Sequence, residues 1–194
     1  ENNNICAEEI TEQELSKLSF LKHPQSVLAV FPIPQNKDTI IDPNKLYLAL
    51  DGVQDPGNMG TIIRIADWFG IKNILCSQNT VDVYNTKTIQ STMGSIFRIQ
   101  IIETDLKYFL SKTQQLSNSA TPIYGALMEG ENIFTKKIEK KNGVIIIGSE
   151  SHGIREDVLP LITSPIHIPR GKGSQTESLN ASVAAAIIMA TICR

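Results

Sequence analysis

The sequence contains little cysteine and no hydrophobic run long enough to cross a membrane. Its three cysteines, Cys6, Cys76 and Cys193, are widely spaced and odd in number, which argues against a disulfide framework and against a cysteine-based metal site. This usage favours a reducing, cytoplasmic setting. The apolar run at 181–193 is too short and too rich in alanine for a membrane span, and the first residues show no signal-peptide pattern.

The sequence also lacks a large excess of either positive or negative charge. Lys and Arg number 18 against 20 Asp and Glu, which gives a formal net charge of -2. The protein therefore has no overall basic character, and any nucleic-acid contact must come from a local patch. With 41% hydrophobic and 20% charged residues, the chain reads as an ordinary globular protein that can bury a substantial core.

Short apolar runs alternate with helical patterns along most of the chain. We expect helices near 8–21, 58–69, 86–94, 105–116 and 155–162, and from about 178 to the end. We expect strands at 26–34, 46–50, 73–77, 97–102, 122–127, 143–148 and 165–168. This alternation predicts an α/β fold with a mainly parallel sheet covered by helices on both faces.

Three loops rich in glycine and small polar residues follow predicted strands. They are "DGVQDPGNMG" (51–60), "SESHGIRED" (149–157) and "PRGKGSQTESLN" (169–180). Since ligands of open parallel sheets bind beyond the carboxyl ends of strands, the loops favour a nucleotide-like ligand. The first loop lacks the G-x-G-x-x-G pattern of dinucleotide-binding folds, which disfavours an ordinary Rossmann site. Each loop alone could also be a tight connection with a capping residue.

The predicted helix at 58–69 carries one arginine, Arg64. Its core face would consist of Ile62, Ile65, Ala66 and Phe69. Arg64 lies on another face, where it could pair with Asp67 or reach a phosphate or a reacting oxygen. We expect Trp68 to be part of the core. In the final helix, Ser178 could serve as the N-cap, and Leu179, Val183, Ile187 and Ala190 would form the apolar face.

Taken together in this order, the three loops resemble motifs of the SpoU (TrmH-type) RNA ribose methyltransferases of the SPOUT superfamily. The first motif, N-x-G-x-x-x-R, is matched by Asn58, Gly60 and Arg64. The second, G-x-E-x-x-G, is matched by Gly148, Glu150 and Gly153. The third is matched by Ile168 and Pro169 followed by "SLNASVAAAI" (178–187).

The resemblance implies a deep C-terminal trefoil knot, a homodimer, and S-adenosyl-L-methionine as the cofactor. It also implies an activity that needs no metal, the transfer of a methyl group to a ribose 2′-hydroxyl of rRNA or tRNA. The implied catalytic residues are Arg64, Asn58, Glu150, Ser178 and Asn180. The implied cofactor-binding residues are Gly125, Ala126, Leu127, Gly148, Gly153, Ile168 and Leu179.

The resemblance also divides the chain. Residues 41–194 correspond to the catalytic domain, and residues 1–40 look like a remnant of an N-terminal RNA substrate-binding domain and its linker. Two features depart from the family pattern. His152 stands in the second loop where small residues or lysine are common, and the 170–177 connection is about two residues longer than usual.

Chemistry leaves the role of Arg64 open. Within the family the matching arginine has been proposed as a general base, but a guanidinium holds its proton under ordinary conditions. We favour a positioned cation that binds phosphate and stabilises the developing oxyanion.

Two alternatives to the leading function are a non-catalytic RNA-binding or ribosome-assembly factor and a methyltransferase acting on a base nitrogen. Few basic residues are available to RNA. Near the loops they are Arg64, Arg155, Arg170 and Lys172, and a second set could be Lys136, Lys137, Lys140 and Lys141.

Overall fold

The computed structural model describes residues 7–21, 23–34, 42–116, 121–138 and 141–194. It divides into two compact units, Glu1–Gln35 and Asn36–Arg194. The domain boundary predicted at residues 40 and 41 lies outside the described residues, as does Cys6. Within the described residues, no helix is both long and apolar enough to cross a membrane.

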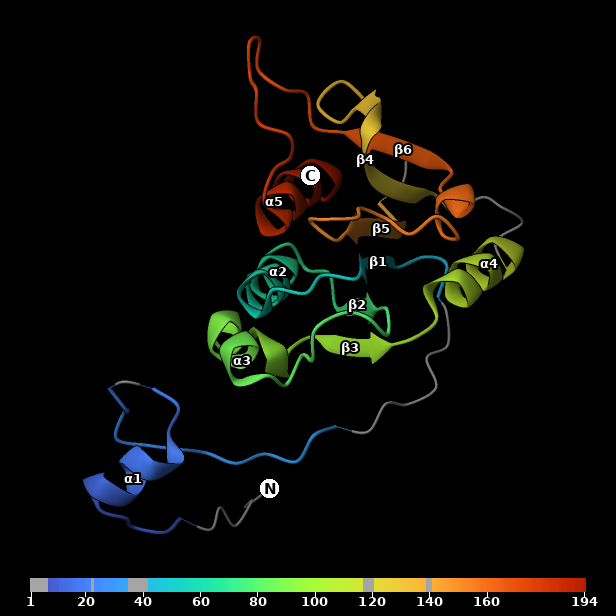
Figure 1. Ribbon diagram of the computed structural model, residues 1–194. Helices are drawn as coiled ribbons and strands as arrows, with labels where there is room; N and C mark the ends of the chain where they lie inside the picture. The colour runs from blue at the N-terminus through green and yellow to red at the C-terminus, as the bar shows by residue number, and fades with distance from the viewer. Residues whose placement is uncertain (1–6, 22, 35–41, 117–120, 139–140) are drawn as a thin grey trace. The chain divides into compact units, whose positions relative to one another are not determined.

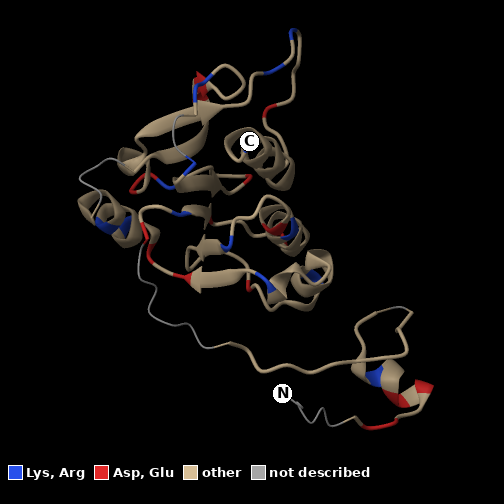
Figure 2. Cartoon of the chain, turned by 180° about the vertical axis from the view of Figure 1, so that it is seen from behind, with Lys and Arg blue, Asp and Glu red and all other residues tan. Residues whose placement is uncertain are grey.

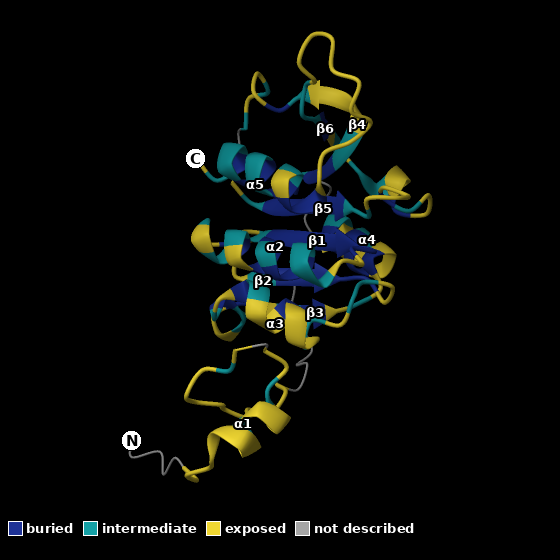
Figure 3. Cartoon of the chain, turned by 60° about the vertical axis from the view of Figure 1, so that its left-hand side comes forward, coloured by how far each residue is buried: buried dark blue, intermediate teal, exposed yellow. Residues whose placement is uncertain are grey.

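The first unit contains one short helix, α1 (Glu12–Leu18). A capping box starts it: the Thr11 hydroxyl accepts from the Glu14 N–H, and the Glu14 carboxylate accepts from the Thr11 N–H. All of α1 is exposed or half-buried (Figure 3). The strand predicted at 26–34 is wrong, because these residues are exposed and form no strand. Pro32 and Pro34 lack the N–H that a sheet ladder requires.

The second unit is built on a six-stranded sheet with the order β3-β2-β1-β5-β4-β6 (Figure 1). Its strands are β1 (Leu46–Asp51), β2 (Asn73–Cys76), β3 (Gln100–Glu103), β4 (Ile123–Asn132), β5 (Gly143–Gly148) and β6 (Ser164–His167). Every neighbouring pair is parallel. The predicted parallel α/β fold is therefore confirmed. β4 runs five residues beyond its predicted end, and its register on β6 shifts between Ala126 and Glu131.

Alternate residues of each central strand enter two separate cores. On one face, Leu48 and Leu50 of β1 pack with α2 (Pro56–Trp68) and α5 (Ala181–Ile192). On the other face, Tyr47 and Ala49 pack with α4 (Leu106–Leu116). The helices accordingly lie on both faces of the sheet in Figure 1. This two-sided burial explains why the strands read as continuous apolar runs.

Helix α2 begins two residues earlier than predicted. The Asp55 carboxylate is its N-cap and accepts from the Asn58 N–H at 2.7 Å, and Pro56 occupies the first turn. This hydrogen bond holds the pKa of Asp55 below its usual value. The buried face consists of Met59, Gly60, Ile62, Ile63 and Ala66. The prediction for Trp68 is wrong: its side chain is 85% exposed.

Helix α3 (Thr86–Thr92) packs closely on α2 at Gly60. A Cβ atom at Gly60 would lie 2.4 Å from both the Ser91 Cβ and the Thr88 carbonyl oxygen. Only glycine permits this approach of the two helices. A short 3-10 helix, η1 (Ser95–Phe97), then leads into β3 where the sequence predicted an earlier strand start.

Two other predicted helices differ from the structure. Residues 155–162 contain only the 3-10 helix η2 (Leu159–Leu161), with Pro160 inside it. Helix α5 begins at Ala181 rather than Ser178. Its buried residues are Ala181, Ser182, Ala185, Ile188, Met189 and Ile192. The predicted apolar face was therefore wrong at Leu179 and Val183, which are 45% and 47% exposed.

Candidate functional site

The three loops singled out by the sequence meet at the carboxyl edge of the sheet. β1 ends at Asp51 and β5 ends at Gly148, and these two residues are paired across the ladder. β6, which precedes the third loop, ends at His167. The loops therefore start from parallel strands that point the same way, which is the arrangement that brings distant segments together.

Asn58 joins the three loops through its side-chain amide. Its Nδ2 donates to the Glu150 Oε1 at 2.6 Å, and its Oδ1 accepts from the Asn180 Nδ2 at 2.9 Å. These partners are 92 and 122 residues away in the sequence. The structure thus brings together three of the five residues predicted to be catalytic.

Asn180 has a second role at the start of α5. Its Oδ1 accepts from the backbone N–H groups of Ser182 and Val183 at 3.0 and 3.3 Å, and from the Ser182 hydroxyl at 2.6 Å. Asn180 is therefore the N-cap that the sequence assigned to Ser178. The prediction failed because both residue types cap helices well. Ser178 instead lies in the exposed connection before the cap and lines the cavity described below.

Arg64 lies on the exposed side of α2, two turns beyond Asn58. Among the described residues, no acidic side chain comes within ion-pair distance of it. The predicted pairing of Arg64 with Asp67 is absent among the described contacts. The Asp67 carboxylate instead accepts from the Arg98 Nε at 2.7 Å and from the Lys72 Nζ at 3.1 Å. Arg64 is thus exposed and available to a ligand at the surface.

A cavity of about 740 Å³ opens between the second and third loops and the carboxyl ends of β4, β5 and β6. Eight of the predicted site residues line it: Ala126, Leu127, Gly148, Glu150, Gly153, Ile168, Ser178 and Leu179. Apolar side chains of Ile147, Ile154, Ile166 and Ile188 supply much of the remaining wall. A cavity of this size and polarity is typical of sites for small organic ligands.

The predicted cofactor residue Gly125 is not among the cavity's lining residues. A Cβ at Gly125 would lie 2.4 Å from the Ile162 Cδ1. Gly125 therefore permits Ile162 to pack on β4, and its role in the fold is separate from the cavity.

Backbone geometry explains the two glycines of the second loop. A Cβ at Gly148 would lie 2.2 Å from the Gly153 carbonyl carbon, so no other residue fits there. Ser149 and Gly153 exchange both backbone hydrogen bonds, at 3.0 and 2.9 Å, and Gly153 has φ of +68°. This closed turn places Glu150 and His152 at the cavity. His152 Nδ1 is 2.8 Å from the Ser151 hydroxyl oxygen.

The longer third loop is exposed and is closed by a hydrogen bond from the Arg170 guanidinium to the Glu177 carbonyl oxygen. Glu177 also lines the cavity, so two carboxylate-bearing residues, Glu150 and Glu177, border it. Their negative charge complements a cationic ligand.

The sequence reasoning missed one important interaction at this edge. The Asp51 side chain is fully buried and accepts from the Arg155 backbone N–H at 2.8 Å and from the Arg155 Nε at 2.7 Å. This ion pair ties the end of β1 to the second loop. Arg155, which we had counted among the residues available to RNA, is therefore already paired. An acidic residue ending an otherwise apolar strand was the available signal.

No group of three or more His, Cys, Asp or Glu residues suited to a metal ion occurs within the described ranges.

Comparison with characterised proteins places the chain in a family. The model of the SpoU rRNA Methylase family matches residues 45–190. The 23S rRNA (guanosine(2553)-2'-O)-methyltransferase RlmP of Bacillus subtilis is 29% identical over 93% of this chain and 69% of its own length. The 23S rRNA (guanosine-2'-O-)-methyltransferase RlmB of Blochmanniella floridana is 30% identical over 96% of this chain and 75% of its own. Other curated relatives are covered over smaller shares of their length, 51% for rRNA methyltransferase 3A of Danio rerio and 23% for rRNA methyltransferase 3 of Xenopus laevis.

A solved structure gives the same result. The AdoMet-bound rRNA methyltransferase from Sinorhizobium meliloti has a TM-score of 0.83 and 28% identity, covering 94% of this chain and 69% of that one. The family model spans residues 45–190, so its match includes the sheet and all three loops. The chain therefore belongs to the SpoU rRNA methylase family, as its three motifs indicated.

Proposed function

We propose that the protein is an S-adenosyl-L-methionine-dependent RNA methyltransferase that methylates a ribose 2′-hydroxyl of rRNA or tRNA. The observation that carries this proposal is the hydrogen-bonded chain Glu150–Asn58–Asn180, which joins the three family motifs beside one cavity. The printed names of the two bacterial relatives, both 2′-O-methyltransferases of 23S rRNA, support it.

The cavity suits the cofactor in size and in chemistry. Its volume of about 740 Å³ accommodates a nucleoside-sized ligand, and its apolar wall suits an adenine ring. The closed turn at Gly148 and Gly153 brings backbone close to the ligand space. Backbone at Ile168 and Leu179, with Ala126 and Leu127, would complete the binding site. When bound, S-adenosyl-L-methionine supplies the methyl group in an electrophilic form.

The residues of this chain would align the ribose and stabilise the charge that develops on its 2′ oxygen. Arg64 would hold the nucleotide phosphate and stabilise that charge, since its guanidinium keeps its protons. Asn58 and Asn180 would fix the position of Glu150, because the three side chains are bonded in series. Ser178 would contact the ligand from the opposite wall of the cavity.

The proposal extends to the predicted trefoil knot, to the homodimer and to a cytoplasmic location. After β6 the chain returns to pack α5 against α2 and β5, an arrangement compatible with a C-terminal knot. The exposed Leu179 and Val183 leave apolar surface at the start of α5 that a second copy could cover. An rRNA or tRNA substrate agrees with a cytoplasmic location. We assign residues 41–194 to the catalytic domain and residues 1–40 to RNA substrate binding.

The test compares wild type with Arg64→Ala and Arg64→Lys in single-turnover methylation of total RNA. We expect Arg64→Ala to slow methyl transfer by about 10²- to 10³-fold while S-adenosyl-L-methionine still binds in calorimetry. Lys112→Ala, on α4 across the sheet, is the matched control and should keep the full rate. An Arg64→Lys variant with the full rate and an unchanged pH profile would exclude an arginine-specific role.

Two further outcomes decide between the functions. Digestion of the product RNA to nucleosides distinguishes a 2′-O-methyl group from a methylated base nitrogen. A wild-type protein that binds RNA but neither binds the cofactor nor methylates would identify a non-catalytic RNA-binding or ribosome-assembly factor.

A further inference from the structure

Trp68 is the only tryptophan in the sequence, and its side chain is 85% exposed. It lies four residues after Arg64 near the end of α2, so the two side chains occupy the same face about one turn, roughly 6 Å, apart. An exposed indole ring offers a flat surface on which a nucleic-acid base can stack.

Helix α2 connects two edges of the sheet. Its first turn carries Asn58 at the carboxyl edge, and the residues that follow its last turn line one cavity with the first residues of β1, β2 and β3. Arg64 and Trp68 therefore lie on α2 between the carboxyl edge, which Asn58 marks, and the amino edge of the sheet.

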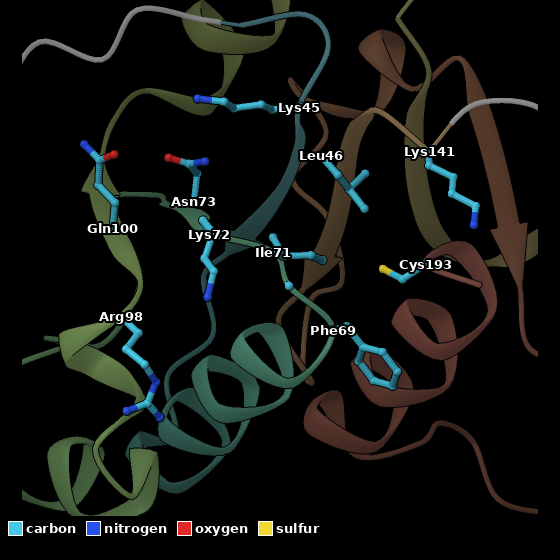
Figure 4. Close-up of a pocket in the computed structure, with 11 residues that line it drawn as sticks. Lys45, Leu46, Phe69, Ile71, Lys72, Asn73, Arg98, Gln100, Lys141 and Cys193 are labelled. Atoms are coloured by element: carbon cyan, nitrogen blue, oxygen red, sulfur yellow. The ribbon is translucent and has the colours of Figure 1, made fainter.

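A second cavity, of about 630 Å³, begins where α2 ends. Phe69, Gly70 and Ile71 line it together with Leu46, Asn73 and Gln100, the first residues of β1, β2 and β3. Figure 4 shows Leu46, Phe69 and Ile71 in the middle, with basic side chains on both sides. The basic residues are Lys45, Lys72, Arg98 and Lys141.

The charges around this cavity do not cancel. Lys72 and Arg98 share a single carboxylate, Asp67, at 3.1 and 2.7 Å. Lys45 lies 3.7 Å from Asp42, and among the described residues no acidic partner lies within ion-pair distance of Lys141. Among the described residues, four cations thus face two carboxylates. Figure 2 shows Lys and Arg spread over several elements of this unit. The four basic residues that line the cavity make it a local basic region in a protein of net negative charge.

The position of Arg98 is fixed by its neighbours. Its Nε donates to Asp67 and its Nη2 donates to the Ser95 hydroxyl at 3.2 Å. Burial of Asp67 raises its pKa, but hydrogen bonds from Arg98 and Lys72 outweigh burial and leave the pKa below its usual value. The carboxylate therefore stays charged and holds both cations at the rim of the cavity.

We propose that Trp68 and this basic cavity bind a single-stranded segment of the RNA next to the methylated nucleotide. A base would stack on the Trp68 ring, and phosphates would contact Lys72, Arg98 and Lys141. Trp68 directly precedes Phe69, a lining residue of the cavity, and an exposed aromatic ring near a basic groove is the combination that holds single-stranded nucleic acid. This inference rests on the proposed function, because it takes Arg64 as the neighbouring contact of the target nucleotide.

The experiment uses Trp68 emission as its reporter. Wild-type protein is titrated with a short mixed-sequence single-stranded RNA and, separately, with inorganic phosphate and with a nucleoside monophosphate. We expect saturable quenching by the RNA, with weaker effects of the two small anions. Trp68→Ala should bind fluorescently labelled RNA about 5- to 150-fold more weakly, the range for loss of one stacked base. Trp68→Phe should recover most of the affinity.

Two controls separate stacking from charge and from folding. Tyr108→Ala removes another exposed aromatic residue, from α4 across the sheet, and should leave RNA affinity unchanged. The Lys72→Gln/Lys141→Gln variant should lower the slope of log K against log salt by up to about 1.4, or 0.7 for each lost phosphate contact. Cofactor binding by every variant should match wild type.

Three results would overturn the inference: RNA that binds without changing Trp68 emission, a Trp68→Ala variant with wild-type RNA affinity, or emission that changes with protein concentration alone. The last result would assign Trp68 to contact between protein copies. Wild-type methylation is measured alongside. If the wild-type protein did not methylate RNA, the proposed function would be contradicted. If wild type methylated RNA and Trp68→Ala bound RNA with wild-type affinity, only this inference would be contradicted.

Discussion

The buried ion pair between Asp51 and Arg155 should be a principal stabilising contact of the carboxyl edge. We expect Arg155→Ala to lower the free energy of unfolding by about 1.5 to 2.5 kcal/mol. Breaking a buried pair usually costs about 3 to 5 kcal/mol, and a hydrogen bond to a charged group is worth about 1.5 to 3 kcal/mol. Two features favour the lower range: the Arg155 side chain is 39% exposed, and Asp51 keeps the backbone N–H of residue 155.

Urea unfolding followed by circular dichroism measures this loss, and thermal unfolding checks it. For a chain of this length, about 2 kcal/mol corresponds to a fall in Tm of roughly 4 to 8 °C. The matched control is Lys45→Ala, which breaks a 3.7 Å pair with Asp42 whose side chains are 60% and 40% exposed. That control should cost less than about 0.5 kcal/mol.

A double-mutant cycle with Asp51→Asn isolates the interaction itself. The coupling energy between positions 51 and 155 should be about 1 to 2 kcal/mol, within the range for contacting residues. If Arg155→Ala destabilised the protein no more than Lys45→Ala does, the pair would not hold the second loop. A coupling energy near zero would lead to the same conclusion.

Gly60→Ala should destabilise the fold by about 1 to 3 kcal/mol in urea unfolding, because the added Cβ meets the Thr88 carbonyl oxygen and forces α2 and α3 apart. Stabilisation by this change, as helix propensity alone would give, would contradict the close approach. Asp67→Asn should destabilise the protein at neutral pH. The folded pKa of Asp67 is depressed, so its contribution is present above the unfolded pKa of about 3.9 and is lost as pH falls through the folded value. Unfolding at pH 7, 5 and 3.5 should therefore show a shrinking difference from wild type, whereas a constant difference would refute the role of the charge.

The sheet and the meeting point of its loops could be predicted from the sequence. β5, "GVIIIG", is buried on both faces. A strand buried on both faces has a continuous apolar run, which can be recognised from the local sequence. Once the strands are parallel, their carboxyl ends share an edge, so the convergence of Asn58, Glu150 and Asn180 follows from topology. The specific partners within that edge came from the motif resemblance.

Other features could not be predicted because they depend on partners far away in the sequence. The apolar run at 26–34 satisfies a local strand pattern, but a strand requires a neighbour, and no segment in the described part of the chain pairs with these residues. Trp68 fits a helix whose last turn could face either the core or solvent, and the α3–η1 connection decides which side is covered. Asp51 and Arg155 are 104 residues apart, so their pairing exists only in three dimensions.

The single amide of Asn58 makes assembly of the site a late event in folding. Its two bonds span 92 and 122 residues, and contacts of such long separation form only after the intervening chain has been ordered. A nascent or partly unfolded chain therefore holds the three motifs apart. The Glu150–Asn58–Asn180 cluster exists only when α2, the loop after β5 and the start of α5 are all in place.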